Sequence, residues 1–284
     1  MFLRREHLAA LVVAVSLAAS AQPSHAQWPV NGVPVCTAAN DQYYPTIAAD
    51  GAGGAIVTWV DYRSGHYDIY AQHVLASGAA DPVWTAANGN ADGTPLCTAA
   101  PGQSYPKIIA DGAGGAIVTW NDGRGGAGNS DVYAQHVLST GAVDPAWPAD
   151  GLGLCTAVAN QYYPTIVTDG AGGAIITWQD ERNNPGTGYY QIYVQHVLAS
   201  GTVDPAWPVD GGRLPAGVSE GAPMIVTDGA GGAIVTWTNT FGSGIYAQHV
   251  LASGAVDSVG RTLTGMPTAR RCARRRPPSI TRRS

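Results

Sequence analysis

The sequence DGAGGAIVTW at residues 50–59 is the main indicator of the fold, because it recurs three more times along the chain with almost no change. The later copies begin at Asp111, Asp169 and Asp228, so the steps between copies are 61, 58 and 59 residues. Each copy joins a turn, in which three glycines are free to adopt positive φ, to a β-branched run that ends in tryptophan. The stretch therefore predicts four tandem copies of one hairpin-containing unit of about 60 residues.

The residues around the first copy predict four short strands in one unit. They are expected at residues 44–49, 55–59, 69–75 and 94–98, with a long connection through 81–84 and no sustained helical spacing of apolar residues. Four short antiparallel strands repeated in tandem are typical of propeller blades. We therefore expect an all-β fold, a β-propeller-like array of four four-stranded antiparallel blades, complete or cut from a larger propeller. A β-solenoid and separate small sandwich domains are the alternatives.

Two series of tryptophans supply the expected core. Each hairpin stretch ends in one, at Trp59, Trp120, Trp178 and Trp237, and a second series follows the same repeat at Trp28, Trp84, Trp147 and Trp207. Burying one tryptophan removes roughly 150–250 Å² from water. Two per unit are enough to act as the main packing anchors between neighbouring units.

The first 26 residues have the pattern of a signal peptide. Arg4 and Arg5 precede an apolar run over residues 8–19, which is too short to span a bilayer comfortably. Ser24 and Ala26 offer small side chains at the two positions that a signal peptidase reads, and residues 19–21 are a second possible cleavage site. We therefore expect a mature chain that starts near Gln27, has no membrane span, and is secreted, periplasmic or attached to the cell surface.

Charge divides the rest of the chain into two parts. Residues 27–260 carry 19 acidic and five basic side chains, whereas residues 261–284 carry eight arginines and no acid. An acidic body argues against a nucleic-acid partner. We expect 27–260 to be the four-repeat domain, and 261–284 to be the start of a fifth repeat that runs into an out-of-frame or disordered basic tail.

Three of the four cysteines recur at one repeat position. Cys36, Cys97 and Cys155 are 61 and 58 residues apart. Equivalent atoms of neighbouring units usually lie beyond the roughly 7 Å Cα separation that a disulfide tolerates. We interpret these cysteines as small buried strand residues, and their spacing is not that of a metal site.

The consensus YPxIxxDGxGGAIVTWxDxR, followed by DIYAQ, resembles repeats of secreted or surface-attached bacterial proteins. These repeats are similar to sialidase-like (BNR) β-propeller blades, and the resemblance covers Trp28 to about Asp257. It implies a propeller architecture, and blades of this kind carry many different functions. A sialidase activity would require a cluster of arginines.

The WxDxR element supplies the candidate ligand-binding residues, Arg63, Arg124 and Arg182. Their guanidinium groups could meet at one end of the propeller and bind a carboxylate ligand. The alternative is an ion pair with Asp61, Asp122 or Asp180 that closes a loop and recurs because the blade recurs. The fourth unit has neither charge.

The recurring histidines and turns predict no metal site and no cofactor. His73, His136, His196 and His249 all lie in QHVL, but equivalent side chains of a ring of blades are too far apart to share one ion unless they line the axis of the ring. Each DGAGG turn offers a single aspartate, whereas a calcium loop needs several oxygen side chains. We interpret the histidines as ordinary strand residues and the turns as hairpin turns.

No catalytic residues stand out. The body has only two glutamates, Glu181 and Glu220, and no evident carboxylate pair or Ser-His-Asp set. The polar residues that differ between units are few: Lys107, Glu181 with Asn183 and Asn184, and Glu220. We therefore expect an exported non-catalytic binding or scaffold module with a glycan or protein ligand. The alternatives are a sialidase-like glycan hydrolase, or part of one, and a purely structural surface repeat.

Overall fold

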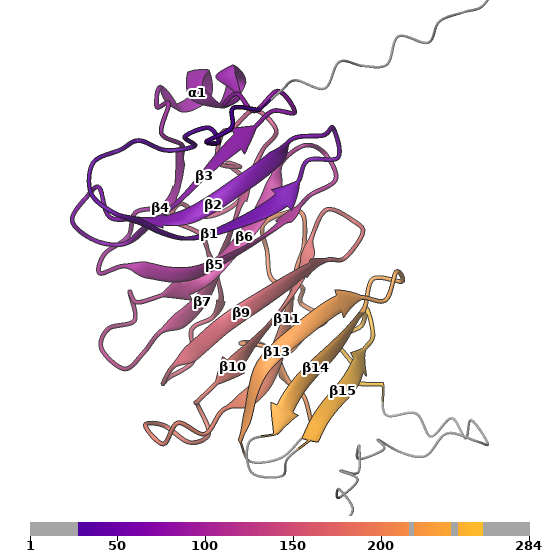
Figure 1. Cartoon of the computed structure of the whole chain (residues 1–284). Coiled ribbons are helices and arrows are strands. Elements are labelled where there is room, and N and C mark those ends of the chain that lie inside the picture. Colours follow the sequence, from indigo (N-terminus) through magenta and orange to yellow (C-terminus); the bar gives the residue numbers. More distant parts are fainter. Residues whose placement is uncertain (1–27, 216–218, 240–243, 258–284) are drawn as a thin grey trace, which may run out of the picture.

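The computed structural model describes residues 28–215, 219–239 and 244–257 (Figure 1). The predicted signal peptide and the Arg-rich tail lie outside the described residues. The chain is all-β, with four antiparallel sheets that follow one another in sequence. No helix in the described part is long and apolar enough to cross a membrane.

Each of the first three sheets has four strands in sequence order. The first sheet holds β1 (Gln42–Ala49), β2 (Ala55–Asp61), β3 (Asp68–Val74) and β4 (Thr94–Cys97). The second holds β5 (Gln103–Ala110), β6 (Ala116–Asp122), β7 (Asp131–Val137) and β8 (Leu152–Cys155), and the third holds β9 (Gln161–Thr168), β10 (Ala174–Asp180), β11 (Gln191–Val197) and β12 (Gly212–Arg213). The predicted strands are present with small shifts at their ends.

The fourth sheet differs from the prediction of four strands. Its described strands are three: β13 (Glu220–Thr227), β14 (Ala233–Asn239) and β15 (Gly244–Val250). Within the described residues each ladder stays inside its own sheet, so no sheet closes on itself.

One short helix, α1 (Pro82–Asn88), was not expected from the sequence. Asp81 caps it by accepting a hydrogen bond from the Val83 backbone N–H, and Pro82 occupies the first turn. The later units cannot repeat it, because Pro148 and Pro208 directly follow the matching tryptophans and proline breaks a helix interior.

The cores lie between consecutive sheets. Ile56 of the first sheet packs in one cluster with Ala116, Val118 and Trp120 of the second, and the same pattern recurs at the next two junctions. The second tryptophan series reaches across the junctions: Trp84 donates from Nε1 to the Ser139 carbonyl at the first one, and Trp207 donates to the Ala252 carbonyl at the third. Trp147 is buried at the second junction, where its Nε1 has no hydrogen-bond partner among the described residues. The prediction that tryptophans anchor neighbouring units to one another is confirmed for the buried members of both series.

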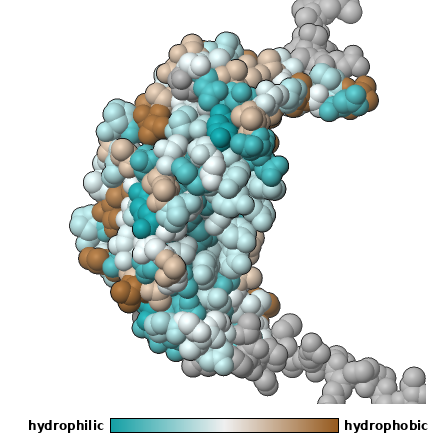
Figure 2. Space-filling model, turned by 90° about the vertical axis from the view of Figure 1, so that its left-hand side faces the viewer, coloured by the Kyte–Doolittle hydropathy of each residue, from teal (hydrophilic) through white to brown (hydrophobic). Residues whose placement is uncertain are grey.

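The first strands of the sheets, β1, β5, β9 and β13, lie in succession along the inner side of the stack (Figure 1). The first and fourth sheets lie at opposite ends of the resulting arc, whose curved outline is visible from the side (Figure 2). This arrangement brings the same position of every repeat to one common surface.

Candidate functional site

Each inner strand begins with a bulge that turns one side chain out of its regular alternation. Tyr44, Tyr105, Tyr163 and Ala222 occupy this position, with φ of 51°, 53°, 54° and 49°. The strand registers shift at the same points. A left-handed conformation costs a non-glycine residue about 1–3 kcal/mol, and here a proline that follows disfavours it further. Such bulges commonly re-aim a side chain next to a binding or active site.

The re-aimed tyrosines join others into one continuous row. Tyr44 and Tyr105 have ring centroids 5.3 Å apart, and Tyr105 and Tyr163 have centroids 4.9 Å apart, although the three lie on three different sheets. Further ring contacts extend the row in both directions. The tyrosine row, in spatial order, is Tyr62, Tyr67, Tyr43, Tyr44, Tyr105, Tyr163, Tyr162 and Tyr190.

Two tyrosines of the row have a raised pKa, each because of a neighbouring side chain. The neighbouring Tyr163 raises the pKa of Tyr105, and the hydrogen bond that Tyr43 donates to Asp41 raises the pKa of Tyr43. The row presents apolar ring faces together with hydroxyl groups.

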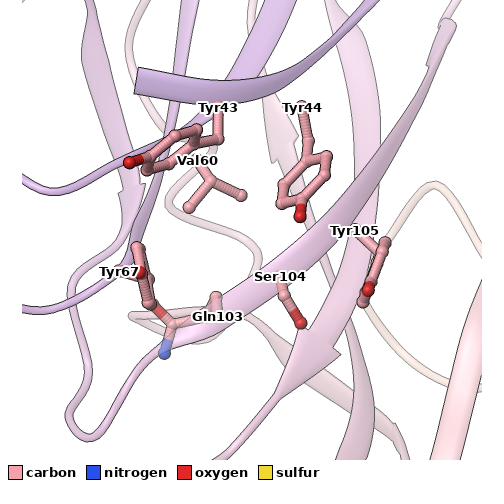
Figure 3. A pocket seen from close by; sticks show the side chains of 7 residues that line it. All are labelled: Tyr43, Tyr44, Val60, Tyr67, Gln103, Ser104 and Tyr105. Atoms are coloured by element: carbon pink, nitrogen blue, oxygen red, sulfur yellow. The ribbon is translucent and has the colours of Figure 1, made fainter. Parts of the chain in front are cut away.

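A first pocket of about 270 Å³ opens in the row between the first two sheets. Tyr43 and Tyr67 lie on one side of it and Tyr44 and Tyr105 on the other (Figure 3). Val60, Gln103 and Ser104 complete the lining. The pocket thus has aromatic walls and a few polar groups, which is the usual composition of small-molecule sites.

A second pocket of about 350 Å³ continues the row toward the fourth sheet. Tyr105 lines both pockets, and Tyr163 also lines the second one. Ala222 stands where the other three repeats have tyrosine, so the missing ring leaves open space. Lys107 and Gln179 supply a cation and an amide to this second pocket.

The three candidate arginines lie in separate places and do not meet. In the first sheet, Arg63 donates to Asp61 from Nε and from a terminal nitrogen at 2.8 and 2.6 Å, and its guanidinium stacks over Tyr70. It also donates to the Asp92 carbonyl at 2.8 Å. Arg124 and Arg182 repeat these contacts in their own sheets. None of the three is among the described residues that line the two pockets.

The cysteines at the ends of β4 and β8 contact the Arg–Asp ion pairs of the next sheet. Cys97 lies beside Arg124 and Asp122 of the next sheet, and Cys155 lies beside Arg182 and Asp180. Both thiols are buried, as predicted, and burial raises the pKa of each to about 12. Cys36 makes the same contacts with Arg63 and Asp61 but is only half-buried.

The histidines lie at the other end of the sheets, each between two carboxylates. His73 contacts Asp50 through Nε2 at 2.9 Å and Asp81 through Nδ1 at 2.8 Å. His136, His196 and His249 are placed in the same way. The interpretation as ordinary strand histidines was therefore incomplete, because each one fastens a DGAGG turn to the connection after the third strand.

The unit-specific acids are not among the described residues that line the two pockets. Glu220 is buried and accepts a hydrogen bond from the Ile192 N–H, while Glu181 accepts from Asn160 and from the Gly188 N–H. Burial raises the pKa of Glu220 above its ordinary range. Among the described residues that line the pockets there is no aspartate or glutamate, so they provide no carboxylate pair of the kind that glycoside hydrolysis uses.

Sequence reasoning singled out Lys107 but missed the tyrosines beside it. Tyr44, Tyr105 and Tyr163 each precede a proline at the same offset before the DGAGG turn, and that recurrence is visible in the sequence. What the sequence does not reveal is the positive φ that directs these rings to a common surface.

No family model and no curated protein sequence matches the chain. Similar solved structures include an endo-arabinase from Bacteroides thetaiotaomicron, with 14% identity, 73% of this chain and 74% of that chain covered, and a TM-score of 0.42. A thermostable family-43 glycoside hydrolase has 11% identity, coverage of 82% and 80%, and a TM-score of 0.42. A family 117 glycoside hydrolase from Zobellia galactanivorans has 9% identity, coverage of 76% and 68%, and a TM-score of 0.40.

These comparisons correct one expectation from the sequence. We had expected a non-catalytic binding or scaffold module, whereas the similar structures are mostly glycoside hydrolases. At this level of identity no residue role transfers to the present chain.

Proposed function

We propose that the four sheets are blades of an exported β-propeller that holds a glycan chain along the tyrosine row, as the sugar-holding part of a glycan hydrolase. The stacking of successive sheets face to face, with their first strands on the inner side, supports the propeller assignment. The signal-peptide pattern of residues 1–26 supports export.

One observation carries the proposal: two pockets share the ring of Tyr105. A ligand that fills both must be extended and must pass over an aromatic ring midway. A sugar unit has a face of C–H groups and an edge of hydroxyls, which matches a tyrosine ring face beside hydroxyl and amide groups. Tyrosine also provides this contact area at low conformational cost.

The backbone strain at the bulges of the inner strands supports the same proposal. Three strained Tyr-Pro bulges place these rings side by side, and a regular strand would avoid the strain. The fourth repeat keeps the bulge but carries Ala222, which widens the second pocket instead of lining it with a fourth ring. The site is thus asymmetric although the fold is repetitive.

Hydrolysis would need two carboxylates on either side of the bond to be cleaved. The described residues that line the pockets contain none, so the proposal assigns to these residues the binding of the chain and not the proton transfers. The catalytic carboxylates are then expected from residues beyond these two pockets.

The proposal is tested with the full chain against two oligosaccharide series, neutral arabino-oligosaccharides and acidic oligogalacturonides. Calorimetry should show binding to at least one series, with affinity that rises with chain length until both pockets are filled. Release of reducing ends is measured on the same mixtures. Failure of every oligosaccharide to bind would contradict the site, and binding that does not depend on length would contradict the use of both pockets.

A further inference from the structure

The outer face of the fourth sheet is apolar and uncovered, although its sequence is that of a covered face. Ile234 is 41% exposed and Ile245 is 73% exposed. Their counterparts in the first three sheets are all fully buried: Ile56, Ile117 and Ile175 for the former, and Ile69, Val132 and Ile192 for the latter. Met224 and Val226 on β13 are also exposed. Such a patch on a protein surface usually marks an interaction site.

The three internal junctions show what covers a face of this kind. At each of them the isoleucine of one sheet packs against the tryptophan-bearing face of the next repeat. In the second sheet that covering face carries Ile108, Val118 and Trp120. The partner that fits the fourth sheet is therefore another repeat of the same sequence.

Within the part of the chain that the structure describes, one such covering face is left free, on the first sheet. Ile47, the counterpart of Ile108, is 66% exposed. Ile47 and Val57 line an apolar pocket of about 230 Å³ together with Val33, Val35 and Trp28 of the N-terminal segment. This pocket lies where, at an internal junction, side chains of the preceding sheet are buried.

The N-terminal segment completes the match. Residues 33–36 correspond in the repeat to β4, and Cys36 already contacts Arg63 and Asp61 as Cys97 contacts Arg124 and Asp122. At the internal junctions this strand also pairs with the third strand of the preceding sheet, as β4 does with β3. Among the described strands, β15 is paired only with β14, so its other edge can receive the segment.

We propose that this face binds the first sheet of a second copy of the chain, in head-to-tail fashion. The two surfaces lie at opposite ends of an open arc (Figures 1 and 2), so they do not contact each other within one chain. A head-to-tail contact leaves a free surface at each end, and it produces closed rings or open chains of protomers. The junction inside this assembly repeats the three junctions within each chain.

The test measures the mass of the full chain by sedimentation over a concentration series. Wild type should form dimers and larger species as concentration rises. Ile245→Asp and Ile47→Asp each place a charge in the apolar contact and should weaken association more than about tenfold. Both positions are exposed in the single chain, so neither variant should unfold it. Val209→Asp, at a position that is exposed in a loop away from both faces, is the control and should associate like wild type.

Mixing the two variants makes the test specific. Ile47→Asp retains an intact fourth sheet and Ile245→Asp an intact first sheet, so an equimolar mixture should form dimers and stop there. A wild type that stays monomeric at every concentration would overturn the proposal. So would association that survives both substitutions, or association that appears only when residues 258–284 are deleted, because the chain's own C-terminal segment would then be the occupant.

Discussion

The ring of Tyr105 on β5 lies edge-on to the ring of Tyr163 on β9, with 4.9 Å between their centroids. The two residues are 58 positions apart and occupy the same place in successive repeats. Their contact exists because each inner strand carries the same left-handed bulge at the same point. A repeat that by itself builds only a sheet thus produces, by stacking, an aromatic surface that no single repeat contains.

The fourth repeat allows a test of the indole hydrogen bond. Trp120 donates from Nε1 to Asp122 at 2.9 Å, whereas Nε1 of the buried Trp237 has no hydrogen-bond partner among the described residues. Replacing either tryptophan by phenylalanine leaves a similar cavity, but only Trp120→Phe also removes a bond to a buried carboxylate. Trp120→Phe should therefore lower the free energy of unfolding by about 1–3 kcal/mol more than Trp237→Phe. Denaturant unfolding of both variants measures this difference, and equal losses would contradict it.

The ion pair between His249 and Asp228 predicts a pH-dependent stability. The hydrogen bond from His249 lowers the pKa of Asp228, and the bond to Asp228 raises the pKa of His249. The contribution of Asp228 is present above its unfolded pKa of about 3.9 and is lost as pH falls through the lowered folded value. The contribution of His249 is present below its unfolded pKa of about 6.5 and is lost as pH rises through the raised folded value.

His249→Gln should therefore lower the melting temperature most in the window between about pH 4 and pH 6.5, and less at pH 8.5. Thermal unfolding of wild type and variant over this range measures the difference. A loss that is the same at every pH would show that the histidine acts only through its shape and neutral hydrogen bonds.

The buried thiols should be unreactive in the folded protein. Burial raises the pKa of Cys97 and Cys155 to about 12, and the thiolate is the form that reacts with alkylating agents. Iodoacetamide at pH 8 should leave both unmodified in the native chain and modify both in denaturant. Mass spectrometry of the peptides measures the modification. Rapid native alkylation of Cys97 would show that the contacts among Cys97, Arg124 and Asp122 open in the folded chain.

Ala222 should allow the site to bind long glycans, because its small side chain leaves the second pocket open. Ala222→Tyr adds the ring that the first three repeats have and fills the second pocket beside Lys107. We expect this variant to lose the extra affinity for long oligosaccharides and to retain the affinity for short ones, since the first pocket is untouched. An Ala222→Ser variant, which leaves the pocket open, is the matched control. Equal loss for all lengths would indicate damage to the whole site.

Much of the fold was predictable because the sequence that specifies one unit occurs four times in the chain. The DGAGG turns, the β-branched strands and the tryptophan anchors each recur in register, and the structure places them as expected for all-β units that pack on their neighbours. Helix α1 was not predicted because its two signals do not distinguish the first unit from the others. Asp81 as cap and Pro82 in the first turn have equivalents in later units that form no helix. The deciding difference is one position, where Thr85 stands in place of Pro148 and Pro208.

The site was harder to predict because it depends on contacts between repeats. Lys107 could be singled out since it departs from the repeat, and the structure places it in the second pocket. The tyrosines recur at one repeat position and therefore did not stand out as site residues. The period-two alternation of a strand also does not reveal a bulge with positive φ. The turn aspartates and the histidines were considered separately, although Asp50, His73 and Asp81 recur together in every unit.

The claim that a glycan lies along the tyrosine row is tested most directly at the ring that both pockets share. Tyr105→Ala removes that ring, whereas Trp28→Ala removes an exposed aromatic from the other end of the first sheet. Stacking of a nucleic-acid base on an aromatic side chain is worth about 1–3 kcal/mol. We expect a comparable contribution from a sugar face on Tyr105, so Tyr105→Ala should weaken oligosaccharide binding roughly tenfold. Trp28→Ala should bind like wild type. Calorimetric affinities that are unchanged in Tyr105→Ala, with both variants folded, would contradict the account.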